Sequence, residues 1–101
     1  MKKFVMAVLF CIPLAAQSAF FTGAELFRYM TESNIVSKRS ATTYILGVAD
    51  SMPTRDCIPP GTPSTQLFEI TMIELASNQS KLYLPASDFV ESAVKRTWRC
   101  K

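Results

Sequence analysis

Apolar residues recur at helical spacing in four stretches of the chain that follow an apolar leader. The first stretch has the clearest start signal, because Thr22 followed by Glu25 forms a capping box. It runs to about Glu32, where two polar residues interrupt the pattern. Its apolar face is formed by Leu26, Phe27 and Met30.

The second stretch spans about Lys38 to Met52, and Pro53 ends it. Gly47 lies inside this helix, where it costs about 1 kcal/mol relative to Ala, so we expect a neighbouring helix to approach closely there. The apolar face repeats at three and four residues. It comprises Ala41, Tyr44, Ile45, Val48, Ala49 and Met52.

The connector at 54–61 is rich in turn residues, and a third helix is predicted after it. Thr62 is expected as the N-cap, with Pro63 at the first helical position. The apolar face is wide enough to imply burial on two sides. Its members are Leu67, Phe68, Ile70, Met72, Ile73 and Leu75.

A polar stretch at 77–81 ends the third helix, and Pro85 is placed to start a fourth. The face of that helix is formed by Phe89, Val90, Ala93, Val94 and Trp98. The pattern as a whole predicts an all-α protein, a small bundle of about four helices.

The first nineteen residues have the pattern of a cleaved signal peptide. Lys2 and Lys3 precede an uncharged apolar run at 4–16, and small residues follow it. The run is shorter than the roughly 20 residues that span a bilayer. Cleavage after Ser18 or Ala19 would remove the leader with Cys11, so we predict a mature domain at 20–101 in the periplasm, with no further membrane contact.

Charge and composition exclude several classes of function for the mature chain. Removing the two leader lysines leaves nine basic residues against eight acidic ones, a formal charge of +1, which does not favour nucleic acid binding. A basic cluster at 95–101 is typical of a solvated helix end. The chain has no His and no glycine-rich phosphate loop, so we predict neither an enzyme nor a bound cofactor.

Two cysteines, Cys57 and Cys100, remain after leader removal. An even count in a short exported chain predicts a disulfide, since the periplasm is oxidising. Closing a loop of this length stabilises the fold by roughly 4 kcal/mol in the chain-entropy model. Metal binding is the alternative, but two thiolates without any His make a poor site.

Five short motifs follow one another along the chain: Tyr44-Ile45-Leu46-Gly47-Val48-Ala49-Asp50, Cys57-Ile58-Pro59, Gln66-Leu67, Leu84-Pro85-Ala86 with Phe89-Val90, and Trp98-Arg99-Cys100. In this order they resemble the Rap/Tai immunity proteins over nearly the whole mature chain. That resemblance implies a periplasmic antidote to a type VI secretion effector, typically an amidase that cuts peptidoglycan stems. It also implies that the connection between the third and fourth helices enters the effector's active site.

By this resemblance the effector-binding residues are Asn78, Gln79, Ser80, Lys81 and Tyr83. A plain solvated loop with Tyr83 packed on the core is the alternative. Family members often have a second disulfide, and its two positions here are Met30 and Ala41, so that bridge is absent.

Two other functions remain open: an acid-activated periplasmic chaperone resembling the Hde type, and a phage-type exclusion or lysis-modulating factor. Protection of unfolded clients near pH 2 to 3, without hydrolase binding, would favour the chaperone. The wide apolar faces of the second and third helices lead us to expect a homodimer.

Overall fold

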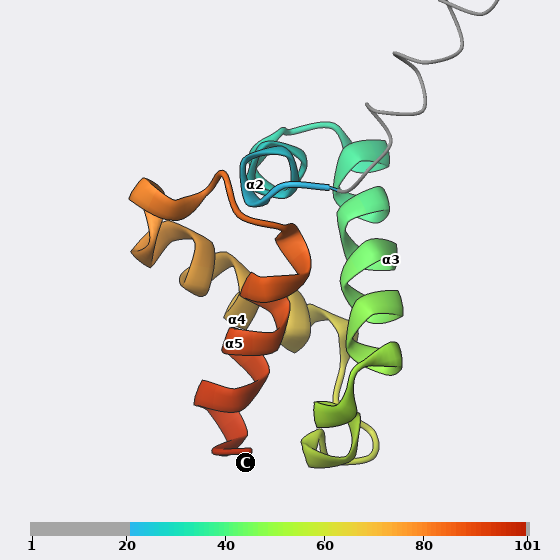
Figure 1. Cartoon of the computed structure of the whole chain (residues 1–101). Helices are drawn as coiled ribbons and strands as arrows, with labels where there is room; N and C mark the ends of the chain where they lie inside the picture. The colour runs from blue at the N-terminus through green and yellow to red at the C-terminus, as the bar shows by residue number, and fades with distance from the viewer. Residues whose placement is uncertain (1–20, 101) are drawn as a thin grey trace, which may run out of the picture.

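The structure is a computed structural model, and it describes residues 21–100. The predicted signal peptide lies outside these residues. Four α-helices and two short 3-10 turns follow one another (Figure 1), which confirms the all-α prediction. The elements are α2 (Gly23–Thr31), α3 (Ile35–Ser51), η1 (Pro53–Cys57), α4 (Ser64–Ser77), η2 (Gln79–Lys81) and α5 (Ala86–Trp98).

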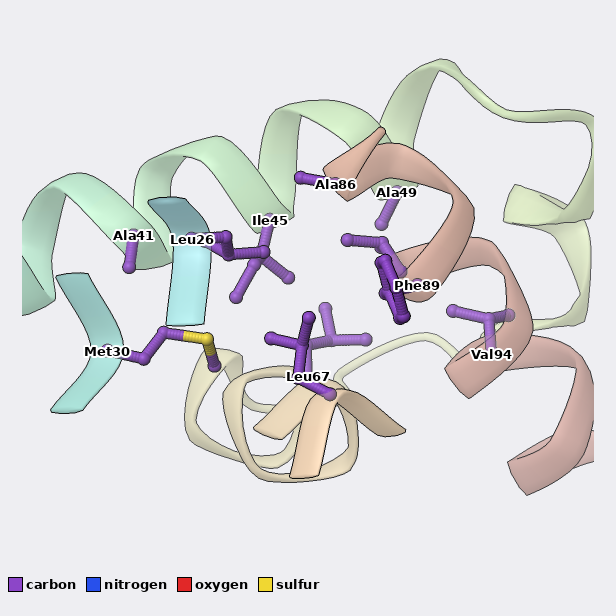
Figure 2. Close-up of a cluster of buried hydrophobic side chains, with 11 residues drawn as sticks. Leu26, Met30, Ala41, Ile45, Ala49, Leu67, Ala86, Phe89 and Val94 are labelled. Atoms are coloured by element: carbon purple, nitrogen blue, oxygen red, sulfur yellow. The ribbon is translucent and has the colours of Figure 1, made fainter. Parts of the chain in front are cut away.

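The helices enclose one core. Figure 1 shows α3 along one side of the molecule, α2 crossing its upper end, and α4 passing behind α5. Each of these helices contacts the other three. Figure 2 shows Leu26, Ile45, Leu67 and Phe89, each from a different helix, pointing into the shared interior. Burying a side chain of this size contributes about 1.5–3 kcal/mol.

Met30 and Ala41, the positions that the resemblance assigns to a second disulfide, are part of this core. Both are fully buried, and they lie at the same end of the cluster in Figure 2. Apolar packing between α2 and α3 occupies these two positions.

The predicted start of α2 is confirmed. The Thr22 side-chain hydroxyl accepts a hydrogen bond from the Glu25 amide at 3.2 Å, and the Glu25 carboxylate accepts one from the Thr22 amide at 3.0 Å. Two amide groups at the helix start are satisfied by this reciprocal pair.

The start of α3 was predicted too late, at about Lys38. Asn34 is the N-cap, and its side-chain oxygen accepts a hydrogen bond from the Val36 amide at 2.7 Å. The first turn, which contains Ile35 and Val36, is exposed. Apolar periodicity therefore cannot reveal it, whereas the capping chemistry of Asn could have.

The predicted capping of α4 is also wrong. Pro63 is the N-cap, and the first helical residue is Ser64. The Thr62 hydroxyl donates instead to the Pro59 carbonyl at 2.6 Å, which closes the turn of the connector. Pro85 likewise occupies the N-cap position of α5, one residue before the helix.

Two further expectations about the helix faces are corrected. Apart from the backbone of its own helix turn, no atom of the described residues lies within 4 Å of the position that a Cβ would take at Gly47, so no neighbouring helix approaches it. On α4, Leu67 and Leu75 are buried, but Ile73 is exposed. The wide apolar stripe of α4 is thus only partly covered.

The predicted disulfide between Cys57 and Cys100 is present, with the two Cα atoms 5.8 Å apart. It joins the end of η1 to the residues that follow α5. The connector before α4 is thereby fixed to the end of α5, so both outer ends of the α4–α5 pair are constrained.

Candidate functional site

The five residues predicted to bind a partner lie on the connection between α4 and α5. Gln79, Ser80 and Lys81 form η2, and all three are exposed. Tyr83 is 71% exposed, so the alternative that packs it on the core is wrong. Figure 1 shows this connection at the edge of the molecule away from α3. Four of the five side chains can therefore reach a partner.

Asn78, the fifth residue, faces the protein. Its side-chain amide donates to the Glu74 backbone carbonyl at 2.8 Å and more weakly to the Glu74 carboxylate at 3.4 Å. Its own backbone carbonyl accepts from the Lys81 amide at 2.9 Å. Asn78 thus ends α4 and closes η2, so its place in the site is structural.

The other end of the connection is bound to α2. The Gly23 amide donates to the Leu84 carbonyl, and the Ala24 amide donates to the Leu82 carbonyl, both at 2.9 Å. The first amides of a helix have no partner within the helix. Here the loop carbonyls satisfy two of them, and in return the loop backbone is held on both sides of Tyr83.

This contact requires a glycine. A Cβ atom on Gly23 would lie 2.6 Å from Cε2 of Phe89 and 3.2 Å from the Leu82 carbonyl oxygen. Both distances are shorter than ordinary van der Waals contact. The absence of a side chain at Gly23 lets the loop backbone and the Phe89 ring approach the start of α2.

An open hollow of about 380 Å³ lies between the connection and α5. Lys81, Asp88 and Glu91 contribute to its wall. The bidentate ion pair between Glu74 and Arg96 also lines it, with nitrogen–oxygen distances of 3.1 and 3.3 Å. The wall of this hollow, which lies beside the exposed loop, contains both acidic and basic side chains and is suited to polar contacts with a protein surface.

Tyr44, on α3, is the titratable group with a displaced pKa among the described residues. Burial raises the pKa of Tyr44, and the negative charge of Asp88 raises it further. Its ring lies 5.0 Å from that of Phe21, which in turn lies 5.5 Å from Tyr29. Tyr44 is therefore neutral at physiological pH and packs as an aromatic residue.

Residues 21–100 contain no group of three His, Cys, Asp or Glu side chains that could hold a metal ion. What the arrangement offers chemically is a fixed, exposed turn with an aromatic residue beside it. Such a surface is suited to binding a protein.

The pair of Glu74 and Arg96 was not predicted from the sequence, in which Arg96 belongs to the basic cluster interpreted as a solvated helix end. The two residues are 22 positions apart, so no local pattern links them. One signal was available: Leu67, Thr71 and Glu74 follow the core-facing spacing of α4, which places a carboxylate where burial is expected.

A family model described as Rap1a immunity proteins matches residues 22–100 of the chain. No curated protein and no solved structure gives a significant match.

Proposed function

Since the chain belongs to the Rap1a immunity protein family, we propose that it binds and inhibits a peptidoglycan amidase that a type VI secretion system delivers into the periplasm. The inhibitor would have no catalytic step of its own. It would block the effector by occupying its active-site cleft.

The exposed and doubly anchored connection between α4 and α5 is the observation that carries this proposal. Asn78 fixes its first residues to α4, and the carbonyls of Leu82 and Leu84 fix its last residues to α2. A loop whose backbone is already ordered in the free protein avoids the entropy cost of fixing that backbone on binding, about 1–2 kcal/mol per residue.

Within this loop we propose Tyr83 as the main anchor, because tyrosine is enriched among residues that dominate binding energy and this one is already exposed. Gln79, Ser80 and Lys81 would supply adaptable polar contacts around it. Asn78 would support the loop without touching the effector.

A periplasmic location is supported by two observations. The sequence begins with the pattern of a signal peptide, and the Cys57–Cys100 disulfide is typical of an oxidising compartment. In the part of the chain that the structure describes, no helix has the length and apolar character to cross a membrane.

We further propose that two copies associate through α3. Ile35 and Val36 are 67% and 66% exposed, and a hollow lined by Val36, Thr43 and Tyr44 runs along the same helix. Light scattering on the mature protein should give the mass of a dimer, and Val36→Asp should give that of a monomer. A monomeric mass for the unmodified protein would contradict this proposal.

Protection of a susceptible bacterium tests the function. Cells that receive a peptidoglycan amidase in the periplasm should lyse without this protein and grow with it, and any hydrolase encoded beside this gene is the first to test. A version that lacks residues 1–19 is the matched control, since it should remain in the cytoplasm and fail to protect. If the protein gave no rescue and no binding against a broad panel of peptidoglycan hydrolases, the proposal would be refuted.

A further inference from the structure

Glu74 is a charged residue in the interior of the molecule. It is 6% exposed and lies on α4 where that helix packs against α5. Burying a carboxylate is costly unless its oxygens are paired. Both oxygens are paired here: Arg96 donates from Nε to Oε1 at 3.1 Å and from Nη2 to Oε2 at 3.3 Å.

The same carboxylate also reaches the start of the loop. Asn78 donates its side-chain amide to the Glu74 carbonyl and weakly to Oε2, and its backbone carbonyl closes η2 through the Lys81 amide. A chain of contacts therefore runs from Arg96 on α5, through Glu74 on α4, to the first residue of the loop.

Stability alone is a weak explanation for this arrangement. The Arg96 side chain is 75% exposed, so solvent screens the attraction. A buried ion pair is often no more stabilising than two apolar residues of similar volume. A bidentate ion pair constrains orientation in a way that an apolar pair does not, because the planar guanidinium donates two parallel hydrogen bonds to a carboxylate held in one orientation.

We infer that Glu74 and Arg96 are positioning residues, which set the orientation of Asn78 and thereby hold the loop at residues 78–81 in the conformation that binds the effector. This inference deepens the proposed function and rests on it for the binding step. The two side chains touch the loop and α5, and neither has to touch the effector.

The double variant Glu74→Met with Arg96→Met distinguishes a role in positioning the loop from a contribution to the stability of the fold. Two apolar residues can keep the helices packed, so the melting temperature should change by no more than a few degrees. Without the carboxylate, the Lys81 and Leu84 amides, whose hydrogen bonds shape the loop, should exchange with solvent at least tenfold faster. The dissociation constant for a peptidoglycan amidase that the unmodified protein inhibits should rise at least tenfold.

Two more variants complete the test. Arg96→Lys keeps the charge but loses the fork, so it should give a smaller increase of the same kind even if the double variant folds poorly. Arg28→Met with Glu32→Met removes a surface ion pair at the C-terminal end of α2, where the atoms are 3.1 Å apart, and should change neither loop exchange nor binding.

The inference would be overturned if the loop amides exchanged at an unchanged rate both in the Glu74→Met, Arg96→Met double variant and in Arg96→Lys, whatever the binding result. If the unmodified protein binds no peptidoglycan hydrolase while loop exchange responds as expected, the proposed function fails and the positioning role within the free protein stands.

Discussion

Replacing Gly23 with alanine should destabilise the protein and displace the loop. The added Cβ would lie 2.6 Å from Cε2 and 3.0 Å from Cδ2 of the Phe89 ring, and 3.2 Å from the Leu82 carbonyl oxygen. Phe89 is buried in the core, and Leu82 belongs to the backbone that α2 holds. The ring, the helix start or the loop therefore has to move.

The size of the effect follows from two opposing contributions. Inserting a methyl group into a packed interior costs about 1–3 kcal/mol. Alanine is preferred over glycine by about 1 kcal/mol inside a helix, but Gly23 is the first helical residue, where this preference is weaker. We expect a net loss of about 1–2 kcal/mol, which lowers the melting temperature of a domain of this size by roughly 4–16 °C.

Gly47→Ala is the matched control, because it makes the same chemical change at an open position. Apart from the backbone of its own helix turn, no atom of the described residues lies within 4 Å of the new Cβ, and α3 continues on both sides. This variant should gain about 0.5–1 kcal/mol. Urea and thermal unfolding, followed by circular dichroism with the disulfide intact, measure both variants. A Gly23→Ala protein as stable as the unmodified one would refute the steric argument.

Three other predictions concern the loop, the disulfide and Tyr44. Alanine at all of Gln79–Lys81 should change the free energy of unfolding by less than about 0.5 kcal/mol yet weaken amidase inhibition; undiminished inhibition would assign the contact to a helical face. Serine at both Cys57 and Cys100 should lower the free energy of unfolding by about 4 kcal/mol and reduce inhibition with it, whereas a change below 1 kcal/mol in denaturant titrations would contradict the constraint. Burial, and to a smaller extent the negative charge of Asp88, raises the pKa of Tyr44. The folded protein therefore keeps the Tyr44 hydroxyl proton at pH values above 10, at which the unfolded chain loses it. The free energy of unfolding should therefore fall above about pH 10, and it should fall by less in Tyr44→Phe. If the unmodified protein and Tyr44→Phe lost stability in parallel as the pH rose, the argument would be wrong.

The sequence predicted those parts of the fold that depend on neighbouring residues. The capping box at Thr22 and Glu25 was found because its two members are three positions apart. The faces of the helices were found because burial repeats at helical spacing. The disulfide was found because two cysteines allow one pairing.

The parts that the sequence could not predict depend on residues far apart in the chain. Neither the bond from Gly23 to Leu84 nor the pairing of Glu74 with Arg96 has a local signature. The five site residues stay a prediction from the family resemblance. The exposure of Tyr83 has no local signature, whereas the inward orientation of Asn78 comes from a hydrogen bond to Glu74, four residues earlier at the end of the same helix.

The hydrogen bonds between the start of α2 and the loop also bear on how the protein folds. Gly23 is synthesised 61 residues before Leu84, so a growing chain carries the amides of Gly23 and Ala24 without their final partners until that late segment appears. Contacts between residues this distant in sequence are slow to form, since chain entropy must be lost first. Incomplete chains that end before residue 84 would expose the start of α2 and lack the anchored loop. The last fifth of the chain therefore completes both the fold and the proposed binding surface.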